Sequence, residues 1–263
     1  MSDDINDRKM PLLEHIIELR NRLIYAIVAF FVAFAVCYYF ADHIFAFLLK
    51  PLADAMQNET NPHVIYTNLT ELFVTYIKVA AFAALFVSFP IVAAQLWMFV
   101  APGLYKNERG AFLPYLFATP VLFFLGGSLV YYVVMPLAWK FFLSFQTPGG
   151  PGGVAIHLEA KANEYLSLVM TFIFAFGLCF QLPILLTLLA RVGLISSATL
   201  TSKRRYAIVI IFIAAAFLTP PDVLSMISLA VPLLLLYEIS VLAVRLVERR
   251  AQQAQGQAAP GTE

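Results

Sequence analysis

Long apolar runs separated by short polar segments dominate the sequence. The runs cover residues 23–39, 72–100, 112–135, 165–190, 206–218 and 223 to about 244. A membrane-spanning helix needs about 20 predominantly apolar residues. The pattern therefore predicts an all-α polytopic membrane protein with six transmembrane helices.

The last two runs are separated only by Thr219-Pro220-Pro221-Asp222. Tandem prolines cannot continue a helix, and a carboxylate is costly in hydrocarbon. This predicts a tight hairpin between two short helices. The run 206–218 would be only about 20 Å long, against a hydrocarbon core of about 30 Å. We expect the bilayer to thin locally here, or this pair to lie beside a shielded face.

Two features are expected in the long segment 40–71. An amphipathic piece from His43 to Met56, interrupted at Pro51, is expected to lie along the membrane interface. Asn68 and Glu71 have the spacing of a capping box at the start of the second spanning helix.

Basic residues are distributed unequally between the two sides of a six-span protein. Thirteen of the 17 Lys and Arg residues fall on the side of both termini, and four, Lys50, Lys78, Lys140 and Lys161, fall on the other. The positive-inside rule then places both termini in the cytoplasm. We expect a cytoplasmic amino-terminal segment over 1–22, one membrane domain over 23–250 and a disordered cytoplasmic tail over 251–263.

Composition supports the membrane class. Hydrophobic residues make up 61% of the chain, the mean hydropathy is +0.82, and charged residues make up 13%, against about 25% in soluble proteins. A net charge of +1 disfavours a nucleic-acid-binding protein, which would carry a dense basic face.

The segment 11–23 is amphipathic when drawn as a helix. Leucine and isoleucine side chains cover one face, Glu14, Glu18 and Asn21 cover the other, and Arg20 falls near the middle of the apolar arc. An arginine there must snorkel to water or bind a buried anion. Glu18 and Arg22 also have the spacing of a surface ion pair. The first cytoplasmic loop carries one carboxylate, Glu108, and two carboxylates at one surface suit a cationic ligand.

Sequence motifs for catalysis, metal binding and cofactor binding are missing. The chain has no HExxH, no G-x-S-x-G and no Walker A motif, and its cysteines, Cys37 and Cys179, lie within apolar runs. We therefore expect a non-enzymatic protein without a cofactor. Gly126-Gly127-Ser128 is interpreted as a close-packing helix surface.

Three segments together resemble the TatC family, the signal-peptide receptor of the twin-arginine protein translocase. They are Met10-Pro-Leu-Leu-Glu-His-Ile-Ile-Glu-Leu-Arg20, Phe99-Val-Ala-Pro-Gly-Leu-Tyr-Lys-Asn-Glu-Arg109 and Leu218-Thr-Pro-Pro-Asp222. The resemblance implies a concave, glove-shaped helix bundle in the bacterial inner membrane. It also implies export of folded proteins with single-span TatA- and TatB-like partners in an oligomeric complex, driven by the proton-motive force.

The same resemblance implies roles for individual residues. Glu18 and Glu108 match the acidic pair that recognises the twin arginines, and Arg20 and Phe99 match residues beside them. Further positions implied in partner binding or translocation are Pro51, Tyr131, Gln181, Thr219, Asp222 and Met226. Two of these depart from the family pattern: Gln181 stands where many relatives have a glutamate, and Met226 where some have a polar residue.

A secondary transporter or channel for a small solute is the main alternative. Gln95, Gln181 and Asp222 would then line a polar path. The missing internal repeat and the scarcity of charge within the apolar runs argue against this alternative.

Overall fold

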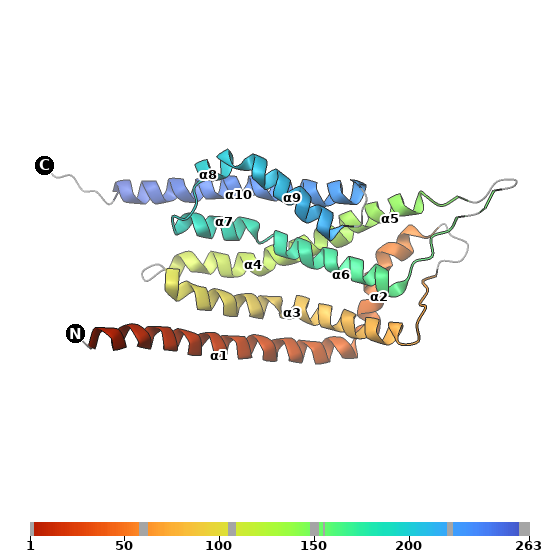
Figure 1. The fold of residues 1–263 in the computed structure, drawn as a ribbon, viewed down its shortest axis with the longest axis horizontal. Helices are drawn as coiled ribbons and strands as arrows, with labels where there is room; N and C mark the ends of the chain where they lie inside the picture. The colour runs from red at the N-terminus through yellow and green to blue at the C-terminus, as the bar shows by residue number, and fades with distance from the viewer. Residues whose placement is uncertain are drawn as a thin grey trace. The chain divides into compact units, whose positions relative to one another are not determined.

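The structure, a computed structural model, describes residues 3–57, 63–104, 109–147, 153–154, 156–219 and 223–257. These residues form helices connected by turns and extended segments (Figure 1). In chain order the helices are α1 (Asp3–Tyr39), α2 (Ala41–Ala55), α3 (Glu71–Leu104), α4 (Arg109–Leu129), the π-helix η1 (Val130–Val134), α5 (Met135–Leu143), α6 (Ala162–Cys179), α7 (Leu182–Arg191), α8 (Ser197–Ser202), α9 (Arg204–Leu218) and α10 (Val223–Gln257). The predicted all-α class is confirmed.

Five helical segments are long and apolar enough to cross a membrane. They are Glu14–Tyr39, Glu71–Phe99, Pro114–Leu143, Ala162–Arg191 and Met226–Arg249. The remaining predicted span corresponds to α9, which has 15 residues and is about 22 Å long. Six spans therefore remain a prediction.

Three helices extend beyond the predicted boundaries. The amino-terminal amphipathic segment and the first span form one helix, α1. The third apolar run continues through η1 and α5 to Leu143. Helix α10 continues to Gln257, whereas residues 258–263 of the expected tail lie outside the described residues.

Prolines break one helix and leave another intact. The run 165–190 is divided into α6 and α7 by a turn at Phe180 and Gln181, and Pro183 lies in the first turn of α7. By contrast, α2 continues through Pro51, so the interruption predicted there is wrong. The capping interaction at α3 is confirmed for Glu71, whose Oε2 accepts from the backbone nitrogens of Thr67 (2.8 Å) and Asn68 (3.2 Å).

Contacts within the chain define two compact units, which are described separately. Unit 1 comprises residues 1–48 and 66–120, and unit 2 comprises 49–65 and 121–263. In unit 1, α1 packs along α3. Their contact includes a small-residue cluster of Cys37, Ala83 and Ala84, against which Phe30 and Phe34 pack.

Unit 2 contains a close glycine-mediated contact between α4 and α6. A Cβ atom at Gly126 would lie 2.7 Å from the carbonyl oxygen of Phe176, and one at Gly177 would lie 2.6 Å from the ring of Phe123. Only glycine permits backbones to approach this closely. The interpretation of the Gly126 segment as a packing surface is confirmed.

Polar contacts attach α8 and α9 to α10 in the same unit. Glu248 of α10 accepts hydrogen bonds from the backbone nitrogen and the hydroxyl of Ser197, at 2.8 and 2.5 Å. Arg204, at the start of α9, forms an ion pair with Glu238 at 2.7 Å. Because Arg204 pairs near the middle of α10, α9 runs beside only the first half of that helix.

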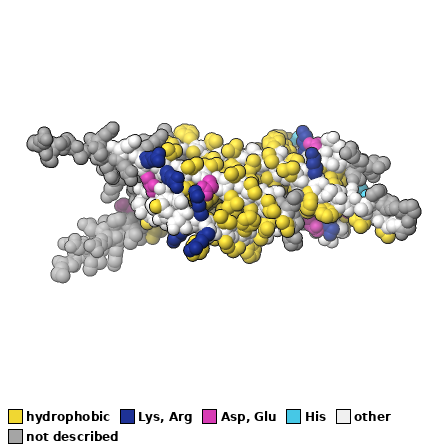
Figure 2. Space-filling view, turned by 90° about the horizontal axis from the view of Figure 1, so that it is seen from above, with side chains coloured by type: hydrophobic (Ala, Val, Ile, Leu, Met, Phe, Trp, Pro, Cys, Tyr) yellow, Lys and Arg dark blue, Asp and Glu magenta, His cyan; other side chains and the backbone are white. Residues whose placement is uncertain are grey.

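The outer surface of α10 is apolar along most of its length. Exposed side chains recur every three or four residues at Val223, Ile227, Val231, Leu235, Ile239, Leu242 and Leu246. Figure 2 shows hydrophobic side chains across the middle of one face and charged side chains gathered toward its ends. This is the surface expected of helices in contact with lipid.

Candidate functional site

The first part of the candidate site joins α1 to the last turns of α3. The imidazole of His15 stacks on the ring of Phe99, with centroids 4.2 Å apart and planes inclined by 14°. Phe99 was predicted as a site residue, but the part played by His15 was not. The contact joins residues 84 positions apart in the sequence, and no local pattern indicates such a pairing.

Glu18 lies one turn after His15 on α1, and both of its carboxylate oxygens face nitrogen atoms. Oε1 accepts from Arg22 Nε at 2.8 Å and also from Nη2 of the same guanidinium. Oε2 lies 3.9 Å from Nδ1 of His15. The Glu18 side chain is 33% exposed. The predicted i,i+4 pair is thus present, in the orientation that favours the helix.

Arg20 is exposed, and its guanidinium donates to Asn21 Oδ1 at 3.2 Å. Ile16 and Leu23, on the apolar face of the same segment, are also exposed. Arg20 thus lies at the surface of the helix, where its guanidinium contacts the side-chain amide of Asn21.

A shallow hollow follows the polar face of α1. Its lining residues include Glu14, Glu18, Asn21 and Arg22, with Tyr25 at one end. The hollow is thus lined by two carboxylates and one guanidinium. Because it is open on one side, a ligand can reach the Glu18 carboxylate from outside the helix.

A second interaction links α3 to α4 on either side of the loop that carries Glu108. Trp97 Nε1 donates to the hydroxyl of Thr119 at 2.7 Å, and that hydroxyl donates to the carbonyl of Tyr115 at 2.8 Å. This hydrogen bond ties the two helices that flank residues 105–108. Glu108 itself lies outside the described residues.

The other predicted positions lie in unit 2, so the structure groups Glu18, Arg20 and Phe99 separately from them. Pro51 is buried in α2 and Tyr131 is buried in η1. Thr219 is buried, with its hydroxyl donating to Ala215 O at 2.9 Å. Gln181 is half-buried in the turn between α6 and α7, Met226 is half-buried in α10, and Asp222 lies outside the described residues.

Within the part of the chain that the structure describes, no three His, Cys, Asp or Glu side chains gather closely enough to hold a metal ion. Unit 1 instead presents the half-buried carboxylate of Glu18 beside the stacked rings of His15 and Phe99. Such a group suits the binding of a cation.

Comparison with known proteins assigns the family. Residues 14–232 match the family model described as Sec-independent protein translocase protein (TatC). The chain is 50% identical over 248 residues to the Sec-independent protein translocase protein TatC of Magnetococcus marinus, covering 94% of this chain and 89% of that protein. The chain belongs to the TatC family. The TatC of Rickettsia prowazekii is 48% identical and covers 89% of this chain, with 92% of its own length matched.

The fold agrees with a TatC crystal structure, described as the Twin Arginine Translocase Receptor TatC. The TM-score is 0.75 at 35% identity, covering 89% of this chain and 99% of that one. This TatC family member is therefore a non-enzymatic component of a protein translocase and a multi-pass protein of the bacterial inner membrane.

Proposed function

We propose that this chain is the receptor subunit of the twin-arginine translocase. It would bind twin-arginine signal peptides and export folded proteins with single-span TatA- and TatB-like partners, driven by the proton-motive force. The observation that carries the proposal is the Glu18 carboxylate, which already holds a guanidinium through Nε and Nη2 of Arg22. The solved relative described as a twin-arginine translocase receptor supports it.

The chemistry of this carboxylate distinguishes arginine from lysine. A guanidinium offers neighbouring N–H donors in a fixed plane, which match a carboxylate in a way that a lysine ammonium does not. Partial burial of Glu18 strengthens the contact because water competes less there. In the proposal, Glu18 binds one ligand arginine and Glu108 the other, with Arg20 and Phe99 beside them.

Affinity for a twin-arginine peptide and for its twin-lysine version tests this function. Each charge-assisted contact contributes about 1.5–3 kcal/mol, so Glu18→Gln or Glu108→Gln should weaken binding about 10- to 150-fold. Glu14→Gln, in the same hollow, is the matched control and should change affinity much less. Equal binding of the two peptides by the wild type would exclude the proposed recognition.

The proposed topology has six spans and both termini in the cytoplasm, and it rests on the basic-residue distribution. In a variant without the native cysteines, we expect Leu69→Cys and Val154→Cys to react with an impermeant thiol reagent in intact cells. Both positions are highly exposed, at 98% and 87%. Leu194→Cys should react only after lysis. Labelling of that position in intact cells would contradict the topology.

We further propose that α9 and α10 form the docking edge for a single-span partner. Helix α9 is short, and its exposed Phe217 lies close in sequence to the exposed Val223 of α10. Thr219, between them, is turned inward, so its neighbours provide the contact surface. Photocrosslinkers at Phe217 or Val223 should capture a TatA- or TatB-like helix. Capture only from a probe at Val121, in α4, would place the edge elsewhere.

A further inference from the structure

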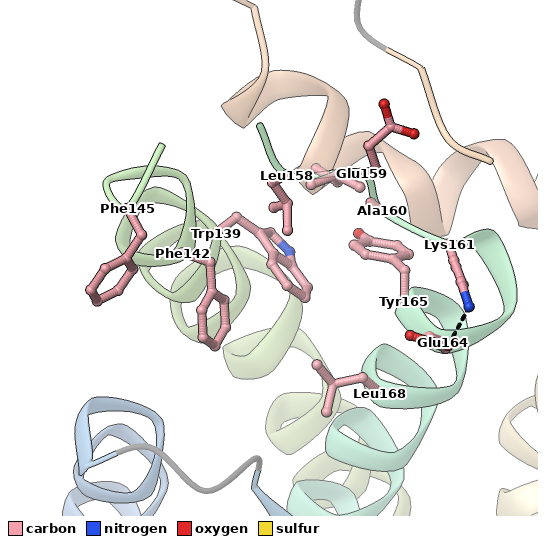
Figure 3. A pocket seen from close by; sticks show the side chains of 11 residues that line it. Trp139, Phe142, Phe145, Leu158, Glu159, Ala160, Lys161, Glu164, Tyr165 and Leu168 are labelled. Carbon is pink, nitrogen blue, oxygen red and sulfur yellow. Dashed lines mark ion pairs between the residues drawn. The ribbon is translucent and has the colours of Figure 1, made fainter. Parts of the chain in front are cut away.

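Unit 2 contains a cavity of about 400 Å³ between the end of α5 and the start of α6. Figure 3 shows Trp139 and Phe142 of α5 on one side and Tyr165 and Leu168 of α6 on the other. Its volume lies within the range of small-molecule pockets. None of the functions proposed above uses it.

One wall of the cavity is an extended segment, residues 158–161, which hydrogen bonds hold in place. Ile65 donates to the carbonyl of Ala160 at 3.0 Å, and Ala162 donates to the carbonyl of Ile65 at 2.9 Å. Buried Leu52 of α2 also lines the cavity. The cavity is therefore bounded by paired backbone and by packed helices.

The cavity lies beside the ends of two candidate membrane spans. The candidate spans Pro114–Leu143 and Ala162–Arg191 end and begin beside it. The rings of Trp139 and Tyr165, whose centroids lie 4.9 Å apart, both line the cavity. Tryptophan and tyrosine are enriched where hydrocarbon meets the headgroups, so these residues favour a position of the cavity at headgroup level.

Charges of both signs lie on the side of the cavity formed by residues 159–164 (Figure 3). Lys161 Nζ lies 3.4 Å from Glu164, and Glu159 lies 3.9 Å from His63. Both pairs are largely exposed, so exchanging one partner for a ligand costs little. Two carboxylates and one ammonium line the cavity. A ligand that complements them has an apolar body, an anionic group and a cation that donates hydrogen bonds.

We propose that this cavity binds a phospholipid with a phosphoethanolamine headgroup. The upper part of an acyl chain lies against Trp139, Phe142 and Leu168, and the phosphate meets Lys161. The primary ammonium donates to Glu159 or Glu164. Because carboxylates outnumber ammoniums, an anionic phosphatidylglycerol fits less well, and the quaternary ammonium of phosphatidylcholine cannot donate.

Fluorescence quenching of Trp139 tests the proposal on the full chain. The protein is reconstituted in phosphatidylcholine vesicles with increasing mole fractions of phosphatidylethanolamine or phosphatidylglycerol carrying brominated acyl chains. The chain has two tryptophans, so the difference between wild type and Trp139→Phe isolates the Trp139 signal. We expect half-maximal quenching at a mole fraction about two- to fivefold lower for phosphatidylethanolamine.

A second test uses the exposed carboxylates of Glu159 and Glu164. In the double variant Glu159→Gln/Glu164→Gln, the preference for phosphatidylethanolamine over phosphatidylglycerol should disappear. Glu14→Gln in unit 1 should leave this preference unchanged. Equal quenching by the two lipids in the wild type, a preference for phosphatidylglycerol, or a preference that survives in the double variant would each overturn the proposal. The assay contains no signal peptide, so its result is independent of the receptor function.

Discussion

The first helix and the fourth span are both long and apolar, yet they are packed very differently. Within the apolar window of Glu14–Tyr39, 6% of residues are buried, against 44% in Ala162–Arg191. Helix α1 contacts α3 through the small-residue cluster at one end and through the His15–Phe99 stack at the other. In unit 2, α6 packs closely against α4 at two glycines, Gly126 against the backbone of Phe176 and Gly177 against the ring of Phe123.

This difference separates the elements that hold the fold from those that we propose to carry recognition. Glu18 and Arg20, two of the proposed recognition residues, lie on α1, whose apolar window has few buried residues, so substitutions there should alter binding more than stability. Substitutions at the glycine contact should do the reverse. The exposed apolar surface of α1 is then covered by lipid or by another protein.

Of the substitutions considered, Gly126→Val should lower the stability of the protein the most. Its added atoms would overlap the backbone of Phe176, which cannot rotate away as a side chain can. We expect the free energy of unfolding to fall by about 3 kcal/mol or more. Thermal unfolding in detergent measures this change. Ala35→Val, on the exposed face of α1, is the control and should unfold like the wild type. A normal melting temperature for Gly126→Val would show that the contact is not tight.

Ala84→Leu, in unit 1, should lower the stability less than Gly126→Val does. Ala84 is fully buried in the small-residue cluster beside Phe30 and Phe34. Those rings can shift, so we expect a cost of about 1–3 kcal/mol, with weaker disulfide crosslinking between cysteines placed on α1 and α3. Ala35→Leu provides the comparison at an exposed position. Equal crosslinking in both variants would show that the cluster does not hold α1.

The stack of His15 on Phe99 is expected to contribute less to stability than the small-residue cluster does. His15→Ala removes the ring that contacts Phe99, which should cost about 0.5–1.5 kcal/mol and loosen the start of α1 against α3. His15→Phe keeps a ring and should retain the crosslink. If His15→Phe behaves like His15→Ala, the stack is not the stabilising contact.

Arg22→Gln tests the smallest interaction. An i,i+4 ion pair contributes about 0.3–0.5 kcal/mol, so freeing Glu18 from its internal partner should raise affinity for a twin-arginine peptide about twofold. Asn21→Ala, which leaves the Glu18–Arg22 pair intact, should not change it. Weaker peptide binding by Arg22→Gln would mean that Arg22 holds the carboxylate for the ligand and does not compete with it.

Local patterns in the sequence predicted the features that depend on neighbouring residues. Apolar runs located the long helices, Glu71 was assigned to the cap of α3, and Glu18 was matched with Arg22. Gly126 was assigned to a packing surface because small residues let helices approach. Each of these depends on residues within a few positions of one another, or on residue size alone.

Features that depend on distant residues were missed. The His15–Phe99 stack and the Trp97–Thr119 hydrogen bond join different helices, and no periodicity indicates them. Helix α2 continues through Pro51, where proline alone predicted a break. There, burial of Pro51 and Leu52 in the tertiary structure outweighs the local preference.

A double-mutant cycle between the protein and its ligand tests the central claim most directly. Affinities are measured for wild type and Glu18→Gln, each with a twin-arginine peptide and with peptides in which one arginine is replaced by lysine. If Glu18 binds a ligand guanidinium, one replacement should couple to Glu18→Gln by about 1.5 kcal/mol or more, and the other should not. Additive effects at both peptide positions, within about 0.3 kcal/mol, would contradict arginine recognition by Glu18.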